Sequence, residues 1–426
     1  MVILLMFLAL MALVLINVPI AIALAVVTMV AMVAAQGTAI LPNVALIMMD
    51  GATNFPLIAI PLFILAGAIM NSSGISRRLI AFASALLGFV RGGLAMVNIA
   101  TSMFFAEISG SAVADVAALG SILIPAMRRK GYPVPFATAV TSSSATLAVI
   151  IPPSIPMILY AVMAQSSVIQ LFVAGIVPGL LGGLAMMGLC YWFARRHNYP
   201  VEEVFQLRRL WTTFKDAALA FTLPIIILGG IFGGFVTATE GAGLAVVAAL
   251  LIGLIYRELD WQHLRESMIE GGVQTSVVMI LVAASVLVGV YLTEAQVPQS
   301  LAAGIGDLTQ NKFVILAILN VFFLVIGLFL HSAAAIILVV PIVMPLVNSV
   351  GIDPVHFGLI VTLNLGIGQQ TPPVASVLVT ACSVAKADIW EVSKVNIYFI
   401  GVLFSVLMLV TYVPAVPMAL VEYFYR

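Results

Sequence analysis

The chain has 426 residues, of which 63% are hydrophobic and only 8% are charged. A soluble globular domain carries about 25% charged residues, so this composition excludes a protein whose whole surface faces water. The net charge is zero and indicates no class of partner, which leaves the position of each charge as the informative feature. The two cysteines, Cys190 and Cys382, lie in apolar stretches without metal-ligand spacing, and we expect buried thiols.

Long apolar segments predict an all-α polytopic membrane protein. A span needs about 20 apolar residues, so the length allows roughly ten. The first half begins with two helices, 3–16 and 20–35, split before Pro19. The apolar start lacks a basic region and favours a first membrane helix over a cleaved signal. There follow a more polar connection over 37–54, a span over 55–70, and an amphipathic segment over 75–90 that is expected to lie at the interface.

Residues 94–127 form one long segment with an interruption from Glu107 to Ser111. The two arms, of about 15 residues each, are too short to cross the hydrocarbon core, so we expect a re-entrant hairpin. A broken helix follows, with pieces over 133–149 and 155–164 on either side of Pro152-Pro153. A span over 168–194 and a basic loop over 195–215 complete this half.

The second half reads in the same way. Thr237 and Glu240 have capping-box spacing, which favours a helix cap over a ligand role for Glu240. A second hairpin turns near Leu330-His331-Ser332, and a second broken helix is interrupted at Pro372-Pro373. The remaining expected ranges are spans over 217–235, 240–256 and 273–292, a weakly amphipathic stretch over 298–308, the hairpin over 313–347, the broken helix over 357–370 and 374–384, and a single last span over 396–423.

The distribution of Lys and Arg predicts the orientation. Alternating through this scheme puts 15 basic residues on one side, namely Arg77, Arg78, Arg91, Arg128, Arg129, Lys130, Arg195, Arg196, Arg208, Arg209, Lys215, Arg257, Arg265, Lys386 and Lys394. The other side holds only Lys312 and Arg426. Cytoplasmic loops carry the basic excess, so both termini are expected outside, the first hairpin opens from the cytoplasm, and the second opens from the opposite face.

The two halves share markers at a constant offset. Pro125, Gly131 and Pro152-Pro153 correspond to Pro345, Gly351 and Pro372-Pro373, each 220 residues later. Ser111 in the first hairpin tip corresponds to His331 in the second. Because the copies enter from opposite faces, the repeat is inverted, and inverted repeats with broken helices at mid-membrane are typical of secondary transporters.

Four chain breaks in the membrane predict one site. Unsatisfied backbone groups cost several kcal/mol in lipid, so the breaks are expected to face one another. Free carbonyls suit a small cation, and helix N-termini suit a carboxylate. Small polar residues accompany the breaks; Ser143 and Ser144 precede the first, and Gly366 lies before the second. Each serine has an alternative as a bond to the preceding turn.

Titratable residues near the tips leave alternatives open. Glu107 and Asp115 are candidates for function at membrane depth, or for interfacial or capping roles. His331 is the only histidine in an expected tip, and either binds substrate or is a buried hydrogen-bonded histidine. The other histidines, His197, His263 and His356, lie in or beside expected loops and are interpreted as surface residues.

A family resemblance rests on five segments, which read FFAEISGSAVADVAALGSILIPAM, IIPPSIP, TATEGAGLAV, GIDPVHFGLI and QTPPVASVL. Over essentially the whole chain they resemble the large membrane (M) subunit of tripartite ATP-independent periplasmic (TRAP) transporters. The resemblance implies an elevator-type, Na⁺-driven importer of an organic acid in a bacterial inner membrane. It also implies two protein partners, a small (Q) membrane subunit with about four helices and a periplasmic substrate-binding (P) protein. We expect membrane lipid as its surroundings and no nucleic acid partner.

The resemblance and the polar breaks together give the candidate residues. The substrate set is Ser109, Gly110, Ser111, Ser154, His331 and Ser332. The Na⁺ set is Ser109, Ser143, Ser144, Ala148, Ile151, Ser332, Gly366, Gly368 and Thr371. Family members commonly have an acid at the second tip, glycine at the position of Ala375, and a more apolar pair in place of Gln369-Gln370. These departures leave sialic acid, keto acids and dicarboxylic acids all open as substrates.

The expected domain division alternates scaffold and transport units. Residues 92–166 and 311–386 are the two transport halves, and the other units are scaffold helices 1–54, span and arm 55–91, scaffold and basic loop 167–272, span and second arm 273–310, and C-terminal helix 387–426. Three other classes of protein are alternatives to a secondary transporter. They are a channel or the membrane subunit of another uptake system, part of an ATP-driven pump, and an intramembrane enzyme. The sequence has no GxxxxGK[ST] loop and no HExxH motif, so no enzymatic activity is expected.

Overall fold

The computed structural model describes residues 2–16, 18–201, 204–372 and 374–425. All regular elements of this part of the chain are helices. Eight helices among the described residues are long and apolar enough to cross a membrane, judged by length and composition, where the sequence predicted about ten spans. The pieces of the two broken helices fall below that length, whereas both arms of the second hairpin reach 18 residues and are counted.

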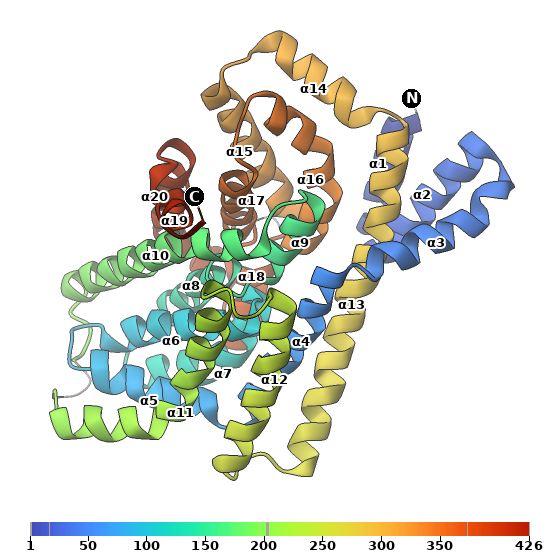
Figure 1. Ribbon diagram of the computed structural model, residues 1–426. Coiled ribbons are helices and arrows are strands. Elements are labelled where there is room, and N and C mark those ends of the chain that lie inside the picture. Colours follow the sequence, from blue (N-terminus) through green and yellow to red (C-terminus); the bar gives the residue numbers. More distant parts are fainter. Residues whose placement is uncertain (1, 17, 202–203, 373, 426) are drawn as a thin grey trace.

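The N-terminal helices are α1 (Val2–Leu15), α2 (Ile20–Gln36), α3 (Leu41–Ala52), α4 (Ala59–Ser72) and α5 (Ile75–Leu87), with short 3-10 turns η1 (Thr38–Ile40) and η2 (Phe55–Ile58). Most of the predicted more polar connection over 37–54 is the helix α3, which presents Leu46 and Met49 outward as an apolar face. Figure 1 shows α1, α2 and α3 at one edge of the molecule, and α2 and α3 both pack on α13.

The first repeat contains α6 (Gly93–Ser109), α7 (Ala112–Arg129), α8 (Val134–Ala145), η3 (Thr146–Val149), α9 (Ile155–Met163) and α10 (Val168–Arg196). The interruption of the first hairpin lies where it was expected, between α6 and α7. The broken helix has a more gradual break than expected, because α8 tightens into the 3-10 turn η3 before Pro152. A 3-10 turn at a helix end redirects the last backbone bonds.

The middle helices are α11 (Leu207–Phe232), α12 (Ala238–Ile255), α13 (Trp261–Glu294) and α14 (Val297–Leu308). The predicted capping box at the start of α12 is confirmed, since the Thr237 and Glu240 side chains bond reciprocally to each other's backbone. Two boundaries differ from the prediction. The basic loop is shorter because α11 already begins at Leu207, and α13 extends from the span into the preceding polar segment.

The second repeat contains α15 (Lys312–Phe329), α16 (Ser332–Ser349), α17 (Pro354–Gly368), α18 (Ser376–Ala385), α19 (Ile389–Tyr412) and α20 (Ala415–Tyr425). The predicted single last span, and with it the single C-terminal helix, is wrong. Pro414 separates α19 from α20, because proline has no N–H to continue the helical ladder.

Corresponding helices of the two halves begin at nearly constant separation. Helix α7 starts at Ala112 and α16 at Ser332, and α8 and α17 start at Val134 and Pro354, both 220 residues apart. Packing exchanges partners between the halves, since α7 packs on α18 while α16 packs on α9. In the same way α8 packs on α19, and α10 packs on α17. The internal repeat thus builds one interlocked bundle rather than two separate halves.

A second group of helices flanks this bundle. Helices α4, α12 and α13 pack together, and α11 joins α12 and α5. The helices α5 and α14 connect the flanking group to α6 and α15 (Figure 1). Glu258 anchors the start of α5, because its carboxylate pairs with Arg77 at 2.7 Å and with Arg78 at 2.8 Å. Helices α10 and α19 pack on the bundle, and the finer domain division stays a prediction.

Candidate functional site

The first hairpin tip is built by a helix end and a helix start. Gly110 ends α6 with a left-handed φ of +55°. A Cβ on Gly110 would lie 3.1 Å from both the Pro153 carbonyl oxygen and the Ile155 nitrogen, so this tip touches the first Pro-Pro break. Ser111 caps α7, its Oγ accepting from the Ala114 N–H at 3.5 Å. The side chains of Glu107 and Ser109 lie outside the described residues.

The second tip mirrors this arrangement with a histidine as cap. Nδ1 of His331 accepts from the Ala333 N–H at 3.5 Å, and Ser332 is buried at the start of α16. Ser111 and His331 line the same cavity of about 760 Å³. Its other polar lining residues are Asn71, Ser76, Glu270 and Gln274, from α4, α5 and α13. The cavity therefore lies between the two tips and the flanking helices.

Ser154 lies behind the first tip rather than in this cavity. It is fully buried, its Oγ donates to the Val149 carbonyl at 2.7 Å, and the same oxygen accepts from the Met157 N–H at 3.4 Å. These bonds close the gap between η3 and α9 across the Pro-Pro break. Ala148 and Ile151 belong to the same turn, and both are buried, with the Ile151 N–H bonded to the Leu147 carbonyl at 2.8 Å.

The serines before the first break form two separate sets of bonds. Ser144 lies 2.8 Å from Ser102 and donates to the Thr141 carbonyl at 3.2 Å, so it ties α8 to α6. Ser143 points the other way and donates to Asn396 Oδ1 on α19 at 2.6 Å. Ser144 thus bonds in part to its own preceding turn, which was one of the two interpretations. Ser143 instead bonds to another helix.

Glycines let the second broken helix approach its neighbours. A Cβ on Gly368 would lie 2.5 Å from the Gly327 main chain on α15, and a Cβ on Gly366 would lie 2.7 Å from the Thr146 side chain. Thr146 and Gly366 are 220 residues apart, so a residue here meets its own repeat counterpart. Thr371 donates to the Ile367 carbonyl at 3.0 Å. Pro373 lies outside the described residues.

Ala375 marks the end of the second break. Its φ of +45° is left-handed, a conformation that costs a residue with a Cβ roughly 1–2 kcal/mol and that glycine adopts freely. The expected family glycine at this position has a physical reason in that geometry, and the alanine carries the strain here.

Gln370 links the two broken helices directly. It is fully buried, and its Nε2 donates to the Ser142 carbonyl and to Thr146 Oγ1, each at 2.7 Å. Its Oε1 accepts from Ser142 Oγ at 2.5 Å. Asn396 donates to the Gln370 carbonyl at 3.2 Å. Gln369, by contrast, bonds within its own repeat, to the Leu365 carbonyl and to Ser376.

The donor atoms around the breaks are chemically suited to a hard cation. Na⁺ prefers oxygen ligands, and hydroxyl, amide and carbonyl oxygens crowd this region. Asn364 tests whether this region suits a cation, because its buried Oδ1 has no hydrogen-bond partner. Its Nδ2 is fixed by the Ile360 carbonyl at 2.8 Å and by Asn320 Oδ1 at 2.6 Å, which leaves that oxygen as an acceptor. Within the described chain no three His, Cys, Asp or Glu side chains gather as metal ligands.

The sequence interpretation missed several of these residues. Asn98, Ser102 and Asn396 are not among the predicted site residues, although an amide or hydroxyl in an otherwise apolar span is itself a signal that a partner exists. One histidine was also placed wrongly. His197 and His263 are exposed as expected, but His356 is buried and bonds through Nε2 to the Val410 carbonyl at 2.7 Å. Cys190 and Cys382 are both buried, as predicted.

Comparison with known proteins gives one family over nearly the whole chain. Residues 7–416 match the family model described as tripartite ATP-independent periplasmic transporter, DctM component. The C4-dicarboxylate TRAP transporter large permease DctM of Pseudomonas aeruginosa is 38% identical over 89% of each chain. The sialic acid TRAP transporter large permease SiaM of Vibrio cholerae is 36% identical over 88% of each.

A further relative is a longer protein. The isethionate TRAP transporter permease DctMQ of Oleidesulfovibrio alaskensis is 42% identical over 95% of this chain, which spans 64% of that relative's length. Among solved structures, the YdaH transporter of Alcanivorax borkumensis has a TM-score of 0.62 at 15% identity, covering 88% of this chain and 89% of that one. MtrF of Neisseria gonorrhoeae has a TM-score of 0.59 at 14% identity, covering 89% and 85%. These two share the fold.

Proposed function

Because the chain belongs to the DctM family, the large permease components of TRAP transporters, we propose that it imports an organic acid by Na⁺-coupled elevator transport. The observation that carries the proposal is the meeting of two hairpin tips from opposite repeats at one cavity, at Ser111 and His331. A transporter needs a site that each membrane face reaches in turn, and paired inverted hairpins are suited to that exchange. A channel has no need of them.

The substrate class follows from the chemistry of the tips. The N-termini of α7 and α16 lie at the tips, and the partial positive charge of a helix N-terminus favours a carboxylate or sulfonate. No Lys or Arg lines the described cavity, so an anion held there relies on main-chain N–H groups and on neutral polar side chains, namely Ser111, His331, Asn71, Ser76 and Gln274. The names of the relatives include a dicarboxylate, sialic acid and isethionate, and each is an organic anion.

Na⁺ is the proposed coupling ion. Ser143, Ala148 and Ile151 lie at the first break, and Gly366, Gly368 and Thr371 lie at the second. Their hydroxyl and carbonyl oxygens would hold the ion in place of its water shell. The Oδ1 of Asn364, which has no hydrogen-bond partner, lies one helical turn before Gly368. A cation bound beside the second break would give this buried oxygen a partner.

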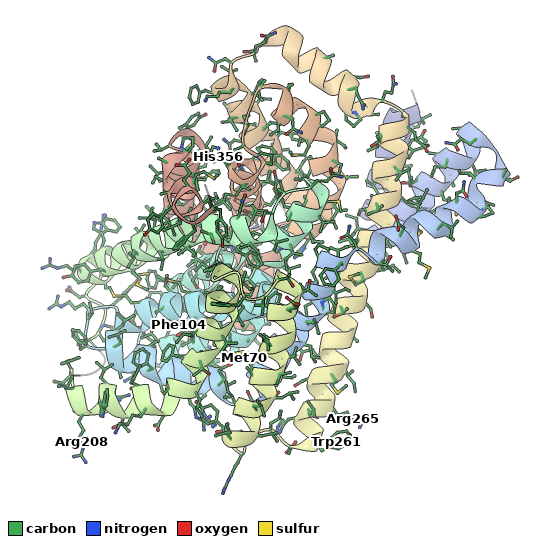
Figure 2. The ribbon with its side chains drawn as sticks, in the orientation of Figure 1. Met70, Phe104, Arg208, Trp261, Arg265 and His356 are labelled. Atoms are coloured by element: carbon green, nitrogen blue, oxygen red, sulfur yellow. The ribbon has the colours of Figure 1, made fainter. Side chains whose placement is uncertain are left out.

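The proposed partners complete an uptake system. A small Q subunit and a periplasmic P protein accompany large permeases in TRAP systems, and one relative bears a name that joins the two membrane parts, DctMQ. We propose the bacterial inner membrane as the location, with both termini periplasmic. Arg208 and Arg265, two residues of the predicted cytoplasmic set, lie at the same end of the molecule, away from His356 (Figure 2).

Uptake into proteoliposomes tests the function. The permease is reconstituted with its Q subunit and P protein, and uptake of a radiolabelled C4-dicarboxylate, sialic acid or isethionate is followed with an inward Na⁺ gradient or with K⁺ at the same ionic strength. Na⁺-dependent uptake of one of these acids is expected. Uptake that proceeds equally without the Na⁺ gradient would refute sodium coupling.

His331 gives a residue-level prediction for the same assay. His331→Ala removes the side chain at the second tip from the cavity and should lower the initial uptake rate by at least about tenfold, as loss of one positioned polar contact to substrate is worth ~1.5 kcal/mol. His263→Ala, on an exposed helix start, is the matched control and should transport normally. Wild-type rates in both variants would remove His331 from the site.

A further inference from the structure

The change from α8 to η3 requires a partner from outside the helix. At this junction the N–H of Thr146 bonds to the Ser143 carbonyl, three residues back, rather than to Ser142. The Ser142 carbonyl instead accepts from Gln370 Nε2 at 2.7 Å. A side chain of the second repeat thereby completes the backbone bonding of the first, at the point where the helix changes its pitch.

The same side chain uses its remaining polar atoms on the same turn. Gln370 Nε2 also donates to Thr146 Oγ1 at 2.7 Å, and its Oε1 accepts from Ser142 Oγ at 2.5 Å. All these groups are buried. A buried polar group that loses its partner keeps its full desolvation cost, so these bonds hold the two breaks in one relative position.

Asn396 closes the arrangement from a third helix. Its Nδ2 donates to the Gln370 carbonyl at 3.2 Å, and its Oδ1 accepts from Ser143 Oγ at 2.6 Å. Because the Ser143 hydroxyl gives its proton to Asn396, its lone pairs are left for a cation. Asn396 thus contacts one residue at each break.

Only the second repeat supplies a side chain of this kind between the two breaks. The repeat counterpart of Gln370 is Ile150, which has no polar side chain to offer. In the first repeat Gly175 of α10 approaches the Ile150 carbonyl closely instead, and a Cβ there would lie 2.2 Å from that oxygen. The side-chain link between the breaks through Gln370 therefore comes from the second repeat alone.

We propose that Gln370, together with Asn396, is a positioning residue that couples the cation sites at the two breaks, so that occupation of one site prepares the other. This inference rests on the proposed Na⁺ coupling. It assigns Gln370 to cooperativity between the sites rather than to selection of the substrate. Any substitution that removes its cross-repeat bonds should leave two weaker, independent sites.

Na⁺-dependent thermal stabilisation of the purified full chain in detergent tests this proposal without transport. The unfolding midpoint is measured against NaCl, with choline chloride keeping the ionic strength constant, because a ligand that binds the native state raises the midpoint. The slope of that midpoint against ln[NaCl] reports the number of Na⁺ ions bound, and in wild type this number should rise sigmoidally with the NaCl concentration. Gln370→Leu should give a Hill coefficient of about 1 for this number and a half-saturating Na⁺ concentration about tenfold higher.

Gln369→Leu is the matched control, since it removes an adjacent buried glutamine whose bonds stay within its own repeat. It should retain the sigmoidal dependence. If Gln370→Leu does not fold, Ser142→Ala removes one cross-repeat donor and should lower the Hill coefficient partway. Sigmoidal curves unchanged in Gln370→Leu or in Ser142→Ala would overturn the coupling role. No Na⁺ response in wild type would instead defeat the proposed function itself.

Discussion

A hydrogen bond from His356 on α17 compensates for the backbone N–H that Pro414 lacks. The carbonyl of Val410 would normally accept from the N–H four residues on, but that residue is Pro414, which has none. His356 on α17 fills the vacancy, its ring N–H donating to that carbonyl at 2.7 Å. The wrongly predicted surface histidine and the wrongly predicted single last span therefore have one cause, a proline whose missing donor is supplied from elsewhere in the chain.

Replacing His356 should reveal this role. His356→Phe keeps an aromatic ring in the buried position but leaves the Val410 carbonyl without its donor, and we expect the free energy of unfolding to fall by about 1–3 kcal/mol. The measurement is reversible denaturation, or the thermal midpoint, in detergent. His263→Phe lies on an exposed helix start and serves as the control. Equal stability of the two variants would show that the bond contributes nothing.

At the site, side-chain identity was predictable and bonding direction was not. Ser143 and Ser144 were expected together at the first break, yet Ser143 turns to α19 and Ser144 to α6. Consecutive residues on a helix point about 100° apart, so each meets a different neighbour, and the neighbour depends on tertiary packing. Asn396 escaped notice for the same reason, since its partners lie 26 and 253 residues away.

At the scale of the helices, the crossing of α15 and α17 depends on paired glycines. Gly327 and Gly368 face each other so closely that a Cβ on Gly368 would lie 2.5 Å from main-chain atoms. Backbone cannot yield as a flexible side chain can, and small residues at such crossings allow close helix packing in membranes. Gly368 thus sets the distance of the second break from the second hairpin.

Gly368→Ala should therefore disturb the second break. We expect a loss of at least about 2 kcal/mol in stability from overpacking, together with loss of Na⁺-dependent uptake, measured by thermal unfolding and in proteoliposomes. Gly401→Ala on α19 is the control, because nothing lies within 4 Å of its added Cβ. That variant should gain stability slightly from helix propensity. A well-folded, active Gly368→Ala protein would contradict the crossing argument.

The hairpins and breaks were predictable because each depends on residues that are close together in the sequence. Prolines, glycines and small polar residues interrupt apolar runs, and interruptions in lipid are costly enough to be informative. Helix ends in polar segments were harder to predict from the sequence. Helix α13 continues from its apolar part back to Trp261, where Asp260 caps it through the His263 N–H at 2.8 Å, and nothing in hydropathy distinguishes such an extension from a loop.

The whole molecule is organised by the exchange of partners between repeats. Helix α7 and its counterpart α16 each pack on the broken helix of the other half. Each also lines a cavity against the flanking helices. The larger cavity, about 760 Å³, lies between α7 and the helices α4 and α13. A smaller one, about 340 Å³, lies between α16 and the C-terminal half of α13, which corresponds to α4.

The two cavities lie at corresponding positions, 220 residues apart, but differ in size. Ala117 lines the larger one and is exposed, while its counterpart Ile337, 220 residues later, lines the smaller one and is buried. The proposed elevator motion would exchange the environments of repeat-related surfaces. The opposite conformation should therefore bury residue 117 and expose residue 337, so that each position is accessible from one membrane face in turn.

Single cysteines at these positions test the exchange. With the buried native thiols Cys190 and Cys382 replaced by alanine, Ala117→Cys should react with a membrane-impermeant maleimide added from the cytoplasmic face, and Ile337→Cys from the periplasmic face. Conditions that shift the population must change the two rates in opposite directions, because one equilibrium governs both. Rates that rise and fall together under Na⁺, substrate and P protein would mean that the flanking cavities do not alternate.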